Sequence, residues 1–212
     1  MTFASREDAG RRLACHLLEN SVDGEVVLGL PRGGIVVAAE VARVLRRPLD
    51  ALVVRKIGHP FHREFAVGAM AEGDVVILDE PVIGSGTPMR EALEEITRDE
   101  QARLREYELK FHVGPGWDLA ARRVLIVDDG LATGATMEAA VLSARKRGAR
   151  EIIVAVPVAS VSAVARLKRV ADGVMALLVD PEFDAVGGYY ESFSQTTDEE
   201  VAALLKSAQG AC

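Results

Sequence analysis

The sequence lacks the cysteines that a disulfide-stabilised or zinc-binding protein needs. Only Cys15 and Cys212 occur among its 212 residues, and Cys212 is the last of them. Two cysteines do not make a disulfide framework, and no cysteines and histidines occur together at zinc-ligand spacing. We therefore expect neither a disulfide-rich fold nor a zinc site.

Long apolar runs and an excess of positive charge are also missing. No apolar run reaches the length that spans a bilayer, and the N-terminal stretch MTFASREDAGRRLACHLLE becomes charged too early for a signal peptide. The formal net charge is −7, so no general basic field attracts nucleic acid, although a local basic pocket is compatible with it. These absences predict a cytoplasmic protein that binds neither membranes nor nucleic acid.

What the sequence does contain is an alternation of apolar runs and helical patterns. Hydrophobic residues make up 49% and charged residues 27%, as in ordinary globular domains. Apolar runs without polar alternation indicate strands buried on both faces, and intervening helices indicate a parallel sheet. Strands are expected at 26–30, 49–54, 124–128, 152–158 and 174–179, and helices at 35–45, 135–147, 161–170 and 198–206. We predict one α/β domain over residues 1–212, with a central, mostly parallel sheet flanked by helices.

Residues 66–116 are expected to depart from that alternation. A hairpin is expected near residues 66–79, with Gly73-Asp74 at its turn. Thr87 and Pro88 are residue types that cap and begin a helix, and its apolar face, interrupted by Glu100, continues to Phe111. The segment from about 80 to 116 is thus predicted to be an insertion with a long helix, which could cover a ligand site or form a homodimer surface.

The stretch VLIVDDGLATGAT, from Val124 to Thr136, joins a buried strand to a helix. Asp128 and Asp129 end the strand, at the edge where open α/β sheets bind ligands. The glycines and threonines that follow permit close backbone approach and offer hydroxyl donors at a helix start, which favours a phosphate. Paired carboxylates beside a phosphate cradle indicate a ligand with a phosphate on one side and hydroxyls on the other, such as ribose 5-phosphate.

This stretch resembles the signature of the type I phosphoribosyltransferases, which bind 5-phosphoribosyl 1-pyrophosphate (PRPP). The family pattern is four hydrophobic residues, two acidic residues, a short spacer, then Thr-Gly and a small residue before Thr or Ser, and every part is present. The resemblance implies that Asp128 and Asp129 hold the ribose hydroxyls and contact Mg²⁺ directly or through water. It implies that the 5-phosphate binds to Gly130, Leu131, Ala132, Thr133, Gly134, Ala135 and Thr136.

PRPP also carries a pyrophosphate, so a second anion site is expected. Arg32, Gly33 and Gly34, in LGLPRGGIVVAAEVA, resemble the family's pyrophosphate loop, in which a strained or cis peptide often occurs. Arg55 and Lys56 end the second strand, where the family has a basic pair that faces the pyrophosphate, and only one of the two need point inward. Weaker candidates in the loop that follows are His59, His62 and Arg63.

The resemblance also implies a small hood that holds the acceptor, and residues 180–197 are the expected hood. Tyr190 is equally compatible with stacking on a flat base and with packing in the core, whereas Phe193 is expected in the core. Phe183 and Tyr189 are further candidates for stacking on a base.

The activity that the resemblance implies is Mg²⁺-dependent transfer of the phosphoribosyl group from PRPP to a nitrogenous acceptor such as a nucleobase. Asp128 and Asp129 would act with Arg32 and Lys56, which offset charge on the departing pyrophosphate. Ala132 stands where the branch acting on 6-oxopurines has an aspartate, which argues against hypoxanthine or guanine as the acceptor. A proton-transfer group, if needed, must come from elsewhere, and Glu64 and the hood are candidates.

Two alternatives to the transferase stay open at this stage. One is a catalytically silent protein that senses PRPP or a nucleotide, and the other is a hydrolase, for which no water-positioning carboxylate is identifiable. The stretches LPRGG, VRKIG and FSQTT give an overall resemblance, over residues 22–201, to a group of single-domain phosphoribosyltransferase-like proteins that brings no assigned acceptor.

Overall fold

A five-stranded parallel sheet forms the centre of the protein. The computed structural model describes residues 2–79, 83, 87–112 and 116–209, without the side chains of residues 62–65, 87, 88 and 209. The strand order is β2-β1-β6-β7-β8, and all four neighbouring pairs are parallel. The strands are β1 (Val26–Gly29), β2 (Leu49–Ala51), β6 (Arg123–Val127), β7 (Glu151–Ser160) and β8 (Gly173–Asp180).

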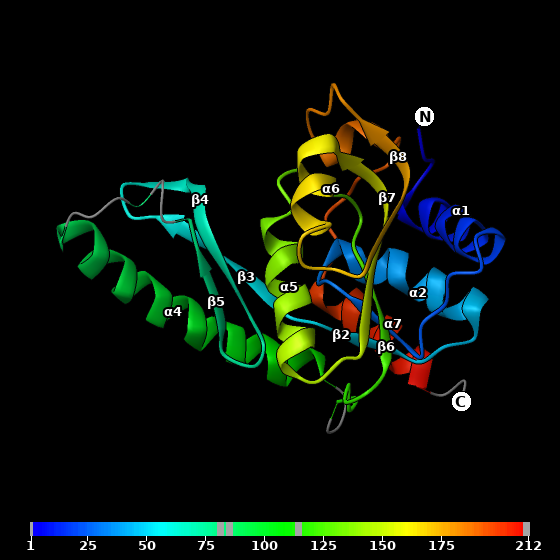
Figure 1. Cartoon of the computed structure of the whole chain (residues 1–212), viewed down its shortest axis with the longest axis horizontal. Helices are drawn as coiled ribbons and strands as arrows, with labels where there is room; N and C mark the ends of the chain where they lie inside the picture. Colours follow the sequence, from blue (N-terminus) through cyan, green and yellow to red (C-terminus); the bar gives the residue numbers. More distant parts are fainter. Residues whose placement is uncertain (1, 80–82, 84–86, 113–115, 210–212) are drawn as a thin grey trace.

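Helices cover both faces of this sheet, which confirms the predicted α/β fold (Figure 1). One face carries α1 (Arg6–Glu19), α2 (Gly33–Leu45) and α7 (Asp198–Gln209), and the other carries α5 (Ala135–Lys146) and α6 (Val161–Leu167). Successive residues of a strand point to opposite faces, so Val27 packs with the first group of helices, whereas Val26 and Leu28 pack with the second. Among the described residues, no helix combines the length and apolar character needed to cross a bilayer.

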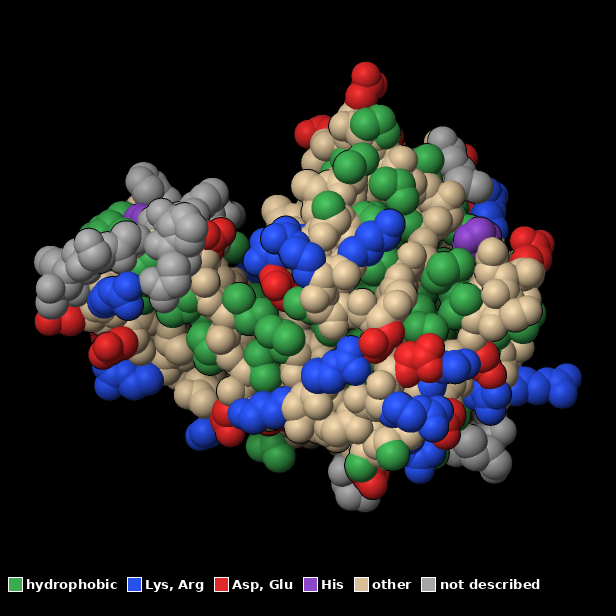
Figure 2. Space-filling model, in the orientation of Figure 1, with side chains coloured by type: hydrophobic (Ala, Val, Ile, Leu, Met, Phe, Trp, Pro, Cys, Tyr) green, Lys and Arg blue, Asp and Glu red, His purple; other side chains and the backbone are tan. Residues whose placement is uncertain are grey.

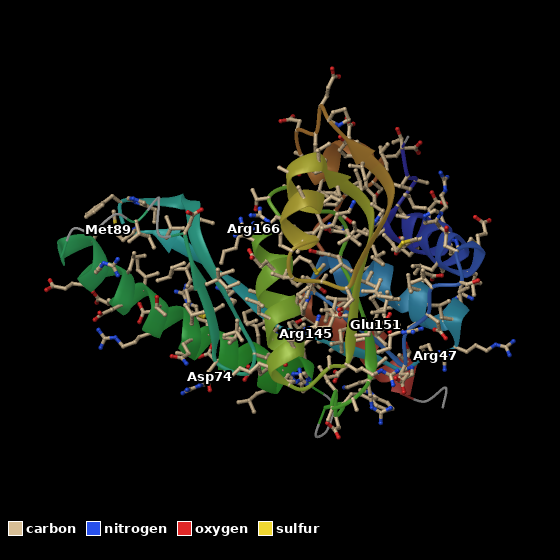
Figure 3. The ribbon with its side chains drawn as sticks, viewed as in Figure 1. Arg47, Asp74, Met89, Arg145, Glu151 and Arg166 are labelled. Atoms are coloured by element: carbon tan, nitrogen blue, oxygen red, sulfur yellow. The ribbon has the colours of Figure 1, made fainter. Side chains whose placement is uncertain are left out.

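A second, antiparallel sheet extends from this body. Its strands are β3 (Val54–His59), β4 (His62–Ala71) and β5 (Val75–Leu78), and the long helix α4 (Thr87–Phe111) packs on it. We call β3, β4, β5 and α4 the antiparallel lobe; it projects to the left in Figure 1, and Figure 2 shows the surface hollowed between it and the body. Figure 3 shows Asp74 at the β4–β5 turn and Met89 near the outer end of α4.

The structure confirms most of the predicted elements and corrects one strand. The hairpin turning at Gly73-Asp74 and the long helix up to Phe111 are both present. The single strand predicted over 49–54 is wrong, because β2 ends at Ala51 and Val54 begins the other sheet. The apolar pattern continues beyond Ala51 because Leu52 and Val53 are buried where the two sheets join. The capped helix α1 has no counterpart among the predicted helices.

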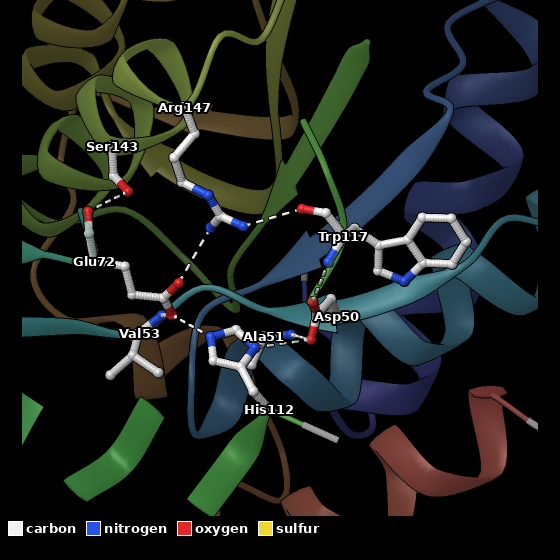
Figure 4. Close-up of polar contacts among 8 residues, drawn as sticks. All are labelled: Asp50, Ala51, Val53, Glu72, His112, Trp117, Ser143 and Arg147. Atoms are coloured by element: carbon white, nitrogen blue, oxygen red, sulfur yellow. Dashed lines mark hydrogen bonds and ion pairs between the residues drawn. The ribbon is translucent and has the colours of Figure 1, made fainter. Parts of the chain in front are cut away.

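A buried group of charged side chains joins the antiparallel lobe to the body (Figure 4). His112, just after α4, has Nδ1 3.3 Å from Asp50 Oδ1 and Nε2 3.0 Å from Glu72 Oε1. Arg147, just after α5, donates to Glu72 Oε2 at 3.1 Å and to the Trp117 carbonyl at 3.2 Å. Asp50 and Glu72 are only 4% and 6% exposed, so the two cations compensate two buried carboxylates. We call Asp50, Glu72, His112 and Arg147 the joint cluster.

We predict that His112→Gln lowers the free energy of unfolding by about 3 kcal/mol at neutral pH, because it leaves buried carboxylates uncompensated. Hydrogen bonds to Asp50 and Glu72 raise the pKa of His112 from 6.5 to about 10, although burial opposes the charged form. A raised folded-state pKa gives a stabilisation that is complete below pH 6.5 and is lost as the pH rises toward 10. Urea unfolding of wild type and His112→Gln across this pH range measures how the difference in their unfolding free energies depends on pH.

His16→Gln, in the last turn of α1 and outside the joint cluster, is the matched control for the loss of a histidine. A difference in unfolding free energy between wild type and His112→Gln that stays constant from pH 6 to pH 10 would contradict the ionic role of His112.

Candidate functional site

Asp128 and Asp129 follow β6 directly, at the carboxyl edge of the parallel sheet. Asp128 Oδ1 accepts a hydrogen bond from the Asp129 amide at 2.8 Å, so the Asp128 carboxyl lies against the main chain of Asp129. Burial raises the pKa of both groups, and the neighbouring Asp129 charge raises the pKa of Asp128 further. A half-buried pair of like charges favours a ligand that donates hydrogen bonds or brings positive charge.

The loop after β1 lies directly against these carboxylates. Gly29 of β1 pairs with Val127 of β6, so the loops that follow the two strands are neighbours. A Cβ on Gly34 would lie 2.6 Å from Asp128 Oδ1, and a Cβ on Gly33 would collide with Asp129 Oδ2. The Pro31–Arg32 peptide in this loop is cis. The absence of two side chains thus lets the start of α2 approach the carboxylates.

The loop from Gly130 into α5 has the form of an anion-binding helix start. Its backbone is fixed to β7, since the Leu131 amide donates to the Val158 carbonyl and the Ser160 amide donates to the Leu131 carbonyl, both at 2.9 Å. Gly134 has φ 74°, and the first helical bond runs from the Glu138 amide to its carbonyl. The amides of the first turn therefore face the loop.

The side chains of this loop differ in their exposure to solvent. Leu131 is buried in the core, whereas Ala132 and Thr133 are exposed. Ala135 and Thr136, in the first turn of α5, are half-buried. The loop therefore presents main chain, small side chains and hydroxyl groups at the edge of the sheet.

Arg55 and Lys56 point to opposite faces of β3, as neighbours on a strand must. Lys56 pairs with Ala69, which packs beside Ala139 of α5, and its charge acts on the Asp128 carboxyl. The Arg55 guanidinium instead contacts Glu100 of α4 at 2.7 Å. The structure brings Lys56 toward the aspartates and Arg55 toward α4, and Glu100, which interrupts the apolar face of α4, is the partner of Arg55.

Arg32 lies beside the two glycines, with its side chain 43% exposed. Its Nη1 is 3.7 Å from Oδ1 of Asp198, the first residue of α7. Lys110, near the end of α4, contacts Oδ2 of the same carboxylate at 2.6 Å. The Arg32 guanidinium thus lies near the start of α7, in an ion pair that is too long for a hydrogen bond.

The segment expected to be the hood packs over the first residues of the loop. It contains the short helix η1 (Val186–Tyr189), and a Cβ on Gly130 would lie 2.7 Å from Val186 Cγ1. The Tyr190 hydroxyl donates to the Asp129 carbonyl at 2.6 Å, and burial raises the pKa of this phenol. Tyr190 is 6% exposed, and its ring centroid lies 5.5 Å from that of Phe3.

The other aromatic residues of this segment are more exposed. The prediction that Phe193 lies in the core is wrong, because this side chain is 39% exposed and rests on Tyr190 and a guanidinium instead of on the sheet. Phe183 stacks on Tyr189 with ring centroids 5.3 Å apart.

Arg6, in the first turn of α1, is a residue of this site that sequence reasoning missed. Its Nε donates to Asp129 Oδ2 at 2.7 Å, and its Nη1 donates to the Ser194 carbonyl at 2.7 Å. Its guanidinium carbon lies 3.8 Å from the centroid of the Phe193 ring. Arg6 and Asp129 are 123 positions apart, and one arginine in a polar helix start carries no signal of such a contact.

The structure describes the remaining candidates only in part. The side chains of His62, Arg63 and Glu64 lie outside the described residues, and the His59 ring accepts a hydrogen bond from the Phe61 amide at 3.1 Å.

Within the part of the chain that the structure describes, no group of three or more His, Cys, Asp or Glu side chains is placed to hold a metal ion. A metal here would thus depend on Asp128, Asp129 and oxygens of a ligand.

The sequence of this chain is similar to sequences of known proteins. The phosphoribosyl transferase domain family matches residues 116–180, which include both aspartates and the loop into α5. The protein named "Putative phosphoribosyl transferase Rv0571c" of Mycobacterium tuberculosis is 44% identical over 207 residues, which are 97% of this chain and 47% of that protein. The chain therefore spans about half the length of the curated relatives it matches.

Two solved structures are similar in fold. The protein TT1426 from Thermus thermophilus is 45% identical and superposes with a TM-score of 0.80, covering 97% of this chain and 98% of that one. A hypothetical protein from Neisseria gonorrhoeae with bound ppGpp is 15% identical, with a TM-score of 0.51 over 98% of this chain and 94% of that one. The second likeness concerns the fold alone.

We predict that Gly34→Ala destabilises the protein by roughly 1–3 kcal/mol, although alanine is the better helix former. The new methyl group would meet Asp128 Oδ1 at 2.6 Å and the Val127 carbonyl at 3.1 Å. Gly173→Ala, where the nearest atoms are at ordinary contact distances from 3.5 Å, is the matched control. Equal unfolding free energies for the two variants would contradict the close approach described above.

Proposed function

We propose that this chain, whose residues 116–180 match the phosphoribosyl transferase domain family, transfers the 5-phosphoribosyl group of PRPP to a nitrogenous acceptor with release of pyrophosphate. One observation carries this proposal: the Gly33-Gly34 loop lies in contact with the paired carboxylates that precede the loop into α5. A ligand that fits this arrangement has a phosphate at each end and hydroxyl groups between them. PRPP has that distribution of groups.

In this proposal the loop into α5 binds the 5-phosphate. Amides of the first turn and the hydroxyls of Thr133 and Thr136 donate to its oxygens, and the helix dipole favours its charge. Asp128 and Asp129 accept hydrogen bonds from the ribose hydroxyls. Hydrogen bonds from a sugar stabilise two carboxylates that burial otherwise disfavours as anions.

The pyrophosphate would lie against Gly33 and Gly34, with Arg32 and Lys56 nearby. Displacement by the acceptor breaks the bond between C1 of the ribose and the pyrophosphate oxygen, and both bonding electrons leave with that oxygen. Lys56 and Arg32 offset the charge that develops on the leaving group, and the carboxylates stabilise positive charge on the ribose. Catalysis of this kind requires positioning and electrostatics and no nucleophilic side chain.

Mg²⁺ fits this donor set only together with the substrate. Mg²⁺ prefers oxygen ligands and is commonly held by one or two carboxylates plus substrate phosphates. Asp128 and Asp129 are the carboxylates that would hold it, directly or through water, and Arg6 already engages one oxygen of Asp129. Bound Mg²⁺ would neutralise charge on the leaving pyrophosphate.

The acceptor is proposed to be a nucleobase, and a sensing role is the second candidate. Ala132 cannot transfer a proton, so a protein that binds PRPP or a nucleotide without turning it over stays the alternative if no other group supplies this step. Incubation with PRPP, Mg²⁺ and a panel of nucleobases separates the two: released pyrophosphate supports the transferase, and binding without release supports the sensor.

We predict that Asp128→Asn combined with Asp129→Asn weakens PRPP binding about 100-fold or more, because two charged acceptors of the ribose hydroxyls are lost. Calorimetric titration of wild type and variant with PRPP and Mg²⁺ measures this change, with melting curves to verify that the variant is folded. Unchanged affinity would refute the ribose assignment, and an absence of binding to the wild type would refute the proposed function.

We also predict that Lys56→Met weakens binding of inorganic pyrophosphate by roughly tenfold. Arg55→Met is the matched control, because its guanidinium lies on the other face of β3 against Glu100, and its pyrophosphate affinity should stay within about twofold of wild type. Arg32→Ala is expected to behave like Lys56→Met. The assignment of the second anion site fails if Arg55→Met has the larger effect.

A further inference from the structure

Arg6 ties together three segments that are far apart in the sequence. Its guanidinium reaches from α1 to the carboxylate of Asp129 and to the main chain of Ser194. We propose that Arg6 is a positioning residue of the ribose site, which fixes the Asp129 carboxylate and couples it to the segment after Tyr190. This inference rests on the proposed function, because it assumes that Asp129 accepts hydrogen bonds from a sugar.

The contact between Arg6 and Asp129 is short and sheltered. The Nε–Oδ2 distance is 2.7 Å, and the side chains are only 11% and 15% exposed. Ion pairs on an open surface contribute little, whereas a sheltered, charge-assisted hydrogen bond fixes its acceptor in one orientation. One oxygen of Asp129 is thereby held in place.

The guanidinium itself has little freedom to move. The Phe193 ring covers one of its faces, with 3.8 Å between the guanidinium carbon and the ring centroid. On the side of α2, a Cβ on Gly33 would lie 2.7 Å from Arg6 Nε. The guanidinium therefore lies between the Phe193 ring, the start of α2 and the Asp129 carboxylate.

Arg6 also links the carboxylate to the segment over the loop. Its Nη1 donates to the Ser194 carbonyl at 2.7 Å, while the Tyr190 hydroxyl donates to the Asp129 carbonyl at 2.6 Å. Asp129 is thus held through its side chain by Arg6 and through its main chain by Tyr190. Because Tyr190 belongs to residues 190–194 and Arg6 contacts Ser194, this segment supports the ribose site from above the loop.

The test compares two sugar phosphates that differ by one hydroxyl group. Ribose 5-phosphate and 2-deoxyribose 5-phosphate are titrated calorimetrically into the full chain, into Arg6→Gln and into Arg6→Lys. We expect wild type to prefer ribose 5-phosphate by about tenfold and Arg6→Gln to lose that preference, while its affinity for inorganic pyrophosphate stays unchanged. Arg6→Lys should recover part of the preference, since lysine restores the charge but not both hydrogen bonds.

Arg11→Gln makes the same substitution at an exposed position of the same helix and should behave as wild type. A wild-type preference that persists in Arg6→Gln would overturn the positioning role. So would a joint loss of sugar phosphate and pyrophosphate binding with a lower melting temperature, since this indicates a purely structural role. A wild type that binds neither sugar phosphate would instead refute the proposed function.

Discussion

The site depends on the compensation of two adjacent carboxylates at the end of a buried strand. Asp128 and Asp129 repel each other and are partly withdrawn from water, which disfavours their charged forms. The Asp129 amide and the Arg6 guanidinium compensate this cost in part, and Gly33 and Gly34 let a second loop approach without steric conflict. The two carboxylates therefore favour a ligand that donates hydrogen bonds to them. In the proposed function the hydroxyl groups of a sugar are these donors, and the surrounding loops bind an anionic group on each side.

A second compensated pair of carboxylates fixes the antiparallel lobe on the body. In the joint cluster, His112 and Arg147 lie against Asp50 and Glu72, and the Glu72 side chain also accepts a hydrogen bond from the Val53 amide. Val53 directly precedes β3, so the cluster anchors the strand that carries Lys56. Charges buried far from the carboxylates of the site therefore determine where one of its cations lies.

The parallel sheet and the loop into α5 could be predicted from sequence because their signals are local. An apolar run, two aspartates and a glycine loop before a helix occupy the consecutive residues Val124 to Thr136. Contacts between distant segments gave no such signal. Arg6 reaches Asp129 across 123 positions, and β2 ends at Ala51 although the apolar pattern continues, because the chain passes between two sheets. Which face of β3 carries Arg55 and which carries Lys56 could be decided only from the pairing of β3 with β4.

The central claim is that one ligand bridges the loop into α5, the paired aspartates and the loop at Gly33-Gly34. Phosphorus NMR of PRPP with the protein and Mg²⁺ tests it most directly, because the 5-phosphate and the two pyrophosphate phosphorus atoms give separate signals. The account predicts that all three signals change together on binding to the wild type and that none changes with the double-asparagine variant of Asp128 and Asp129. A change confined to the 5-phosphate signal would contradict it, since the ligand would then occupy only one of the two anion sites.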